Sequence, residues 1–235
     1  MKSEVEDRAA AVQAIRAGDI EKLERLLSEN PELANVRVDG QRTVLHVATD
    51  WPGHFPNAAR AVAVLVARGA DVNAKFIGRH TETPLHWAAS SDDVAALDAL
   101  LDCGADIEAP GSVIGGGTAL ADAVAFGQWK AARRLIERGA RTTLWQAAAL
   151  GLMNQVEEFF ARDPAPTQDE ITNAFWCACH GGQQPAAEYL AARGANLNWI
   201  GYDEHTALDA ADRSGAQALA EWLRSVGAKP AKELK

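Results

Sequence analysis

A short phrase of glycine, alanine and, in most copies, a polar residue returns along the chain at nearly regular intervals. The intervals between its glycines are 35, 35, 55 and 33 residues, and Asp163-Pro164 takes the place of the phrase inside the longest one. Self-similarity at a period of this size is typical of proteins built by stacking small repeated units. The repeat therefore constrains the fold more than length does. The phrase begins at Gly69, Gly104, Gly139, Gly194 and Gly227.

A second phrase, threonine followed two residues later by leucine, precedes the first one in most units. A glycine often stands seven residues beyond the leucine, as Gly127 does after Leu120. Glycine is favoured just past a helix because the left-handed terminal position strains other residues. Each unit is therefore expected to form a turn, a short helix, a glycine-containing turn and a longer helix. The second phrase occurs as Thr43-Val44-Leu45-His46, Thr83-Pro84-Leu85-His86, Thr118-Ala119-Leu120-Ala121 and Thr206-Ala207-Leu208-Asp209.

The longer helices carry one apolar stripe each, as Val94, Leu97, Leu100 and Leu101 do. A single helix pair cannot bury such a stripe, so the pairs must stack on their neighbours. We expect an all-α solenoid of about seven pairs in a single domain, residues 1–235, with the leucines of the second phrase at equivalent interior positions. The expected units are approximately residues 5–38, 39–75, 76–110, 111–143, 144–170, 171–200 and 201–230.

The segment Thr83-Pro84-Leu85-His86-Trp87-Ala88-Ala89, closed by Gly104-Ala105-Asp106, resembles an ankyrin repeat. The resemblance recurs over roughly residues 5 to 230. It implies an L-shaped stack in which hairpin fingers and inner helices form a concave surface, and this surface usually binds proteins. It also implies that His46 and His86 make structural hydrogen bonds between repeats.

The resemblance further implies which positions vary with the partner. They are the residue before the threonine of the second phrase and the two residues after the paired alanines. His54 and Phe55 join them from an inserted loop, and His80 from a finger. This surface would have an apolar middle and polar ends, as protein interfaces do. The expected contact residues are Arg42, Asp50, Trp51, His54, Phe55, His80, Glu82, Ser90, Ser91, Phe126, Leu150, His180, His205 and Arg213.

Two segments depart from the repeat. Residues 51–56 form an extra stretch whose two prolines and glycine predict a loop between the helices of the second unit. Its aromatic residues either anchor a partner or fold back onto the inner helices. Residues 139–144 are instead too few for a finger, which leaves a notch. The notch either admits a partner's loop or a small ligand, or reflects only the loss of an unneeded finger.

Other classes of function find little support in the composition. A net charge of -9 and a pI near 5.2 repel phosphate backbones, so we expect no nucleic acid partner. The chain shows neither a basic, apolar leader nor an apolar run of the ~20 residues that span a membrane. The three cysteines are too few for a disulfide framework, and we interpret them as reduced and buried. These observations favour a cytoplasmic protein.

Catalytic and metal sites are not expected either. No His-x-x-x-His or Cys-x-x-Cys ligand pair is present, so no metal or other cofactor is predicted. No catalytic spacing stands out, so we expect no enzyme. The glycine cluster 111–117 lacks the lysine and hydroxyl of a phosphate-binding loop and is interpreted as a mobile finger.

We expect a non-catalytic scaffold, a monomer that binds another protein on its concave face. The alternative is a sensor that holds a small ligand in the groove near residues 139–144. Residues 229–235 are expected to be disordered.

Overall fold

The computed structural model describes residues 2–234, and the side chains of residues 5–234. Within this range the chain forms fourteen α-helices and three short 3-10 turns, without a β-strand. A single isolated bridge pairs Arg37 with Thr43. The expected all-α class is therefore confirmed. The chain divides into two compact units, one ending at Ala140 and the other beginning at Arg141, and the single domain stays a prediction.

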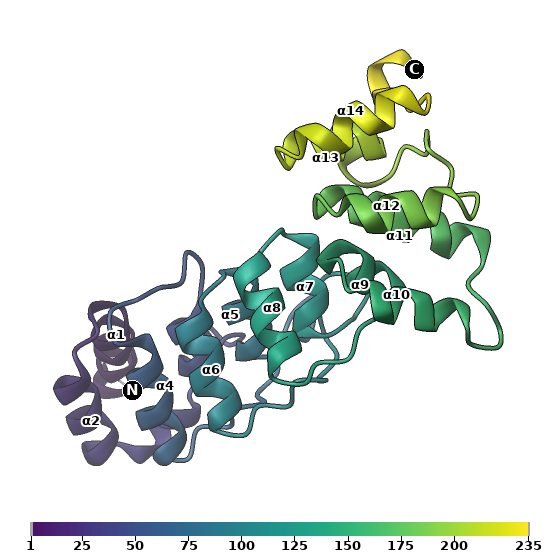
Figure 1. Cartoon of the computed structure of the whole chain (residues 1–235). Helices are drawn as coiled ribbons and strands as arrows, with labels where there is room; N and C mark the ends of the chain where they lie inside the picture. Colours follow the sequence, from purple (N-terminus) through teal and green to yellow (C-terminus); the bar gives the residue numbers. More distant parts are fainter. Residues whose placement is uncertain (1, 235) are drawn as a thin grey trace. The chain divides into compact units, whose positions relative to one another are not determined.

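The first unit consists of two layers of helices (Figure 1). Helices α1, α3, α5 and α7 pack in sequence to form the inner layer, and α2, α4, α6 and α8 form the outer layer. Each inner helix also contacts the outer helix that follows it. The bounds are α1 Lys2–Ala17, α2 Ile20–Glu29, α3 Val44–Thr49, α4 Ala58–Ala67, α5 Pro84–Ser90, α6 Val94–Asp102, α7 Ala119–Ala125 and α8 Trp129–Glu137, with a 3-10 turn at Pro31–Asn35.

The second unit repeats this plan with three helix pairs. Helix α11 packs between α9 and α13 in the inner layer, while α10 and α12 contact each other in the outer one. The bounds are α9 Leu144–Leu150, α10 Met153–Phe160, α11 Gln168–His180, α12 Gln184–Ala191, α13 Ala207–Arg213 and α14 Gln217–Ser225, with 3-10 turns at Tyr202–Glu204 and Ala231–Glu233.

A threonine, which in four cases is that of the second phrase, starts the inner helices from α3 onwards. It is the N-cap of α3, α5, α7, α9, α11 and α13. In all but α7, the side chain three residues later accepts a hydrogen bond from the threonine backbone, which completes a capping box. The leucines that follow are buried as expected: Leu45, Leu85, Leu120 and Leu208 are at most 2% exposed.

The backbone of the glycine-alanine-aspartate phrase is hydrogen-bonded to an asparagine side chain of the preceding unit. Asn35 Nδ2 donates to Gly69 O over 2.7 Å, and its Oδ1 accepts from Asp71 N over 2.9 Å. Asn73 makes the same pair of bonds to Gly104 O, at 3.5 Å, and Asp106 N, at 2.8 Å. The phrase therefore recurs because it forms the joint between successive units.

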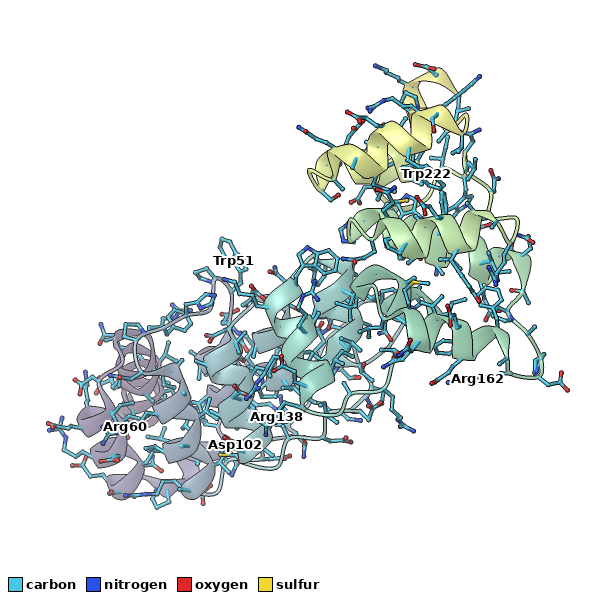
Figure 2. The ribbon with its side chains drawn as sticks, viewed as in Figure 1. Trp51, Arg60, Asp102, Arg138, Arg162 and Trp222 are labelled. Atoms are coloured by element: carbon cyan, nitrogen blue, oxygen red, sulfur yellow. The ribbon has the colours of Figure 1, made fainter. Side chains whose placement is uncertain are left out.

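The outer helices α6 and α8 are joined by ion pairs (Figure 2). Arg138 donates to Asp98 over 2.8 Å and to Asp102 over 2.7 Å, and Arg134 also binds Asp98. These groups are partly exposed, so each pair contributes on the order of 1 kcal/mol or less. They fix the register of neighbouring units more than they stabilise them.

The expectation that residues 229–235 are disordered is wrong for the described part, 229–234. Lys229 O accepts a hydrogen bond from Thr206 Oγ1 over 2.9 Å, and Ala231 N donates to Asp209 Oδ2 over 2.9 Å. Ala231 is buried. These residues cover the start of α13, where a further repeat would otherwise pack, so burial and hydrogen bonds order them.

Candidate functional site

The inserted loop between α3 and α4 displays an aromatic side chain. Residues 50–57 connect these helices, whereas residues 91–93 suffice between α5 and α6. Trp51 is 79% exposed, the largest fraction among the exposed large hydrophobic side chains of the described residues. Figure 2 shows its ring at the tip of the loop, pointing away from the helices.

The loop is held on both sides by the neighbouring helix turns. On one side, His54 N donates to Asp93 Oδ2 over 2.6 Å, and His54 Nε2 lies 3.1 Å from Ser91 O. On the other side, Asn57 Nδ2 donates to Gly18 O over 2.9 Å. The loop thus folds back onto the neighbouring turns, as one of the two interpretations expected. It still leaves Trp51 exposed, which the other interpretation, an aromatic anchor for a partner, requires.

Gly53 allows this close packing. Its φ is +75°, a conformation that other residues rarely adopt. A Cβ at this position would also lie 2.7 Å from Ser91 Cβ. The backbone of the loop that carries Trp51 therefore has little freedom to shift.

The base of the loop is charged. Asp50 Oδ2 accepts from Arg42 Nη1 over 2.7 Å and lies 3.9 Å from Arg16 Nη2. Arg42 also binds Asp39 over 2.8 Å. The tryptophan is therefore bordered by a half-buried ion-pair network, which gives the surface a polar rim.

A second exposed aromatic, Phe126, lies at the same end of the inner layer. It caps the C-terminus of α7 and is 49% exposed. Because α3, α5 and α7 pack in order in one layer, their C-terminal ends follow one another along a single edge. We call this the turn edge, and it comprises Arg16, Asp50, Trp51, His54, Ser90 and Phe126.

Three expected contact residues are not on the surface. Glu82, Ser91 and Leu150 are 5%, 8% and 4% exposed. Glu82 turns inward because its Oε2 accepts from Trp87 Nε1 over 3.0 Å. Ser91 lies beneath the inserted loop, and Leu150 belongs to the apolar face of α9. The prediction that these three residues contact a partner is therefore wrong, because their side chains are buried.

His80 and Phe55 are intermediate cases. The His80 ring stacks on Phe76 with centroids 4.5 Å apart, and its Nδ1 lies 2.8 Å from Glu82 Oε2 without an aligned hydrogen bond. Phe55 is half-buried at the end of the inserted loop. Both side chains support their own segments and offer a partner only part of their surface.

The second unit has an aromatic cluster of its own. Trp176 stacks on His180 at 5.5 Å, and its Nε1 donates to His205 O over 2.9 Å. Arg213 Nη1 lies 3.3 Å from His205 Nε2. Three of the expected contact residues, His180, His205 and Arg213, thus gather around one tryptophan.

Sequence reasoning missed Tyr202, the most exposed ring of this cluster. It is 52% exposed, its hydroxyl donates to Asn173 Oδ1 over 2.9 Å, and its ring meets Trp176 edge to face at 5.0 Å. The residue stands in a finger, outside the positions that the repeat pattern marks. The only feature of the sequence that could have indicated an exposed contact residue here is its position shortly before Thr206, where the finger lies.

His46 and His86 join successive repeats, as the resemblance implied. His46 Nδ1 accepts from Thr43 N at 3.3 Å, so its Nε2 carries the proton that is donated to Glu82 O at 3.1 Å. His86 relates to Thr83 and Gly117 O in the same way. Burial lowers the pKa of His46 to about 4, and burial also lowers that of His86. Both rings are neutral structural groups.

The two thiols of α11 are buried. Burial raises the pKa of Cys177 and Cys179 far above the ordinary thiol value, so neither is a ready nucleophile. Among the described residues, no three His, Cys, Asp or Glu side chains are placed to hold a metal ion.

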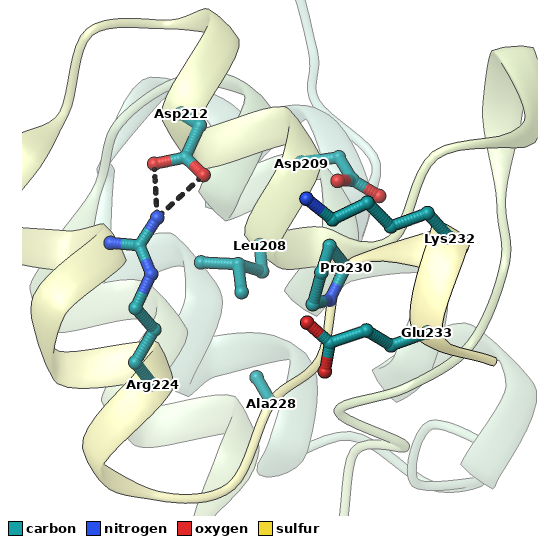
Figure 3. A pocket seen from close by; sticks show the side chains of 8 residues that line it. All are labelled: Leu208, Asp209, Asp212, Arg224, Ala228, Pro230, Lys232 and Glu233. Carbon is teal, nitrogen blue, oxygen red and sulfur yellow. Dashed lines mark hydrogen bonds and ion pairs between the residues drawn. The ribbon is translucent and has the colours of Figure 1, made fainter.

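A cavity of about 360 Å³ lies at the C-terminal end of the second unit (Figure 3). Its rim carries the bidentate pair of Arg224 with Asp212, at 2.7 and 2.9 Å, together with Lys232 and Glu233. Its floor is apolar, with Leu208 at the centre. The lining includes none of residues 139–144, so a ligand site there stays a prediction.

The chain is similar to known repeat proteins. Residues 61–144 match the family model of ankyrin repeats (3 copies). The crystal structure of the human ASB11 ankyrin repeat domain has a similar fold, with a TM-score of 0.55 at 19% identity, over 91% of this chain and 96% of that one. No helix among residues 2–234 is long and apolar enough to cross a membrane.

Proposed function

We propose that this chain is an ankyrin repeat protein and a non-catalytic scaffold that binds another protein through its turn edge. Ankyrin repeats are generally modules of protein–protein interaction. The observation that carries the proposal is Trp51, 79% exposed on a loop that is hydrogen-bonded to the turns on both sides. Large rigid aromatics dominate binding hot spots.

The fixed loop favours binding energetically. Ordering a flexible side chain or loop costs about 0.5–1.5 kcal/mol per side chain on association. The His54 and Asn57 hydrogen bonds already meet much of this cost in the free protein. Trp51 and Phe126 then supply apolar contact, while Arg16 and Asp50 supply the polar rim that protein interfaces show.

All three cysteines are free thiols, with Cys177 and Cys179 buried as expected and Cys103 only half-buried. Free thiols fit a reducing compartment, so the proposal places the protein in the cytoplasm. It also assigns the chain no catalytic residue, no cofactor and a monomeric state. His180, His205 and Arg213 of the second unit are proposed as a secondary contact region.

Removing both exposed rings of the turn edge is expected to weaken the complex at least about 30-fold, the loss for a single hot-spot residue that contributes roughly 2 kcal/mol. Wild-type protein and the variant Trp51→Ala/Phe126→Ala would each be used to capture partners from the native cytosol. A partner identified by mass spectrometry would then be purified and its Kd measured against both proteins.

The control is Val226→Ala, which removes an exposed apolar side chain outside the turn edge. It should leave the Kd at the wild-type value. An equal Kd for wild type and the double variant would show that the turn edge is not the binding surface.

A further inference from the structure

Two carboxyl groups are buried together in the first unit. Asp122 on α7 is 0% exposed and Glu82, just before α5, is 5% exposed. Glu82 is the neighbouring carboxyl group that acts on Asp122, and no N–H or O–H group of the described residues donates to Asp122 Oδ2. Two adjacent buried carboxylates cannot both be ionised at low cost. One proton must therefore lie between them.

This pair anchors the glycine-rich loop 111–117. Ser112 Oγ donates to Asp122 Oδ1 over 2.5 Å and accepts from Ile114 N over 2.8 Å, and Val113 N reaches Glu82 Oε1 at 3.4 Å. Backbone hydrogen bonds from Gly116 N to Ser112 O and from Gly117 N to Ile114 O close the loop on itself, and bonds to Gly111 O and Gly117 O tie its ends to neighbouring segments. The carboxyl pair adds the side-chain bonds that hold Ser112 and Val113 against the helices.

The surroundings offer Asp122 no positive partner. From the segment before α5, His80 lies 2.8 Å from Glu82, and from α5 the neutral His86 donates to Gly117 O. On α8, Arg134 and Arg138 pair with Asp98, while the other charged side chains, Lys130, Arg133 and Glu137, are exposed. Burial and the adjacent Glu82 raise the pKa of Asp122 to about 8, against the opposing hydrogen bond from Ser112.

We propose that the Glu82–Asp122 pair is a proton-dependent latch: the shared proton holds loop 111–117 against α5 and α7, and losing it frees the loop. The latch acts on a finger that carries Val113, 48% exposed, so it controls a surface separate from the turn edge. It does not rest on the proposed function.

The direction of the pH dependence of loop opening follows from the pKa of Asp122 in the closed and the opened loop. In the closed state this carboxyl holds its proton up to about pH 8, whereas in the opened loop it has an ordinary value of about 3.9. Opening therefore releases a proton and becomes more frequent as the pH rises. Between pH 6.5 and 8 the opening equilibrium is expected to grow roughly tenfold, after allowing for protonation of a released His86 near pH 6.5.

Hydrogen exchange of the full chain, followed by mass spectrometry at pH 6.5 and 8, tests the latch. Peptides covering residues 108–118 should lose protection roughly tenfold after correction for the intrinsic exchange rate. In Asp122→Asn the amide can donate to Glu82 and accept from Ser112 without titrating. That variant should stay protected at both pH values.

Two further variants make the outcome decisive. Glu82→Gln should reduce the pH effect, because it removes the adjacent negative charge and its amide can donate to ionised Asp122, and it replaces the first variant if that one does not fold. Asp98→Asn, which alters a carboxylate on the outer layer, should keep the wild-type response. Protection that does not depend on pH in the wild type, or a tenfold loss that persists in Asp122→Asn or Glu82→Gln, would overturn the latch.

Discussion

Gly181→Ala is expected to destabilise the second unit by at least about 3 kcal/mol, the upper part of the range for overpacking. A Cβ at residue 181 would lie 1.9 Å from Ala149 O and 2.8 Å from Ala149 C. Both are backbone atoms of α9, so no flexible side chain can move aside. The change must push α11 away from α9 and loosen the packing on which the unit depends.

Urea unfolding followed by tryptophan fluorescence would measure this loss. Gly215→Ala is the matched control at the next turn, where the new Cβ meets nothing within 4 Å but φ is +74°. It should cost only the strain of a left-handed residue, about 1–2 kcal/mol. If both variants lose the same stability, the approach of α11 to α9 is looser than the structure shows.

The helix pairs could be predicted from the sequence because the same residues recur at equivalent positions of most repeats. A threonine starts the inner helices from α3 to α13, a leucine two residues later enters the core in four of them, and a glycine stands at or just after the end of α7, α9, α11 and α13. Stability in a solenoid is a sum of terms within a repeat and between neighbours. A pattern interpreted correctly in one unit therefore holds in the others.

The exposed surface was harder to predict, because it depends on what each residue meets beyond its own repeat. Ser91 is covered by a loop inserted in the preceding unit, and Glu82 turns inward to meet Asp122, which lies 40 residues later. Trp51 was found because its loop interrupts the pattern. Tyr202 was missed because fingers follow no helical period that would mark its side chain.

Replacing His46 by glutamine is expected to remove about 2.5 kcal/mol from the change in stability between pH 7 and pH 4.5. The His46 ring is 0% exposed, and burial lowers its pKa to about 4, below the ~6.5 of an unfolded histidine. Its contribution is therefore complete above pH 6.5 and is lost as the pH falls towards 4. Glutamine does not titrate.

Glutamine is the right substitute because the chain already uses it in the equivalent place. Gln146 Oε1 accepts from Thr143 N over 2.8 Å and completes the capping box of α9. His46→Gln should therefore fold, although it loses the bond to Glu82 O. His54→Gln, which removes a side chain that is 62% exposed, is the control for the loss of one imidazole.

The comparison must be between variants, because Asp122 acts in the opposite sense. Its raised pKa gives stability that is complete near pH 4 and is lost as the pH rises through about 8. Between pH 4.5 and 6.5 the contributions of His46 and Asp122 therefore oppose each other, and the wild-type profile can be flat although both groups titrate. Urea unfolding of His46→Gln across this range should reveal a stability that declines with rising pH, relative to wild type. Parallel profiles would mean that His46 is protonated as readily in the folded protein as in the unfolded chain.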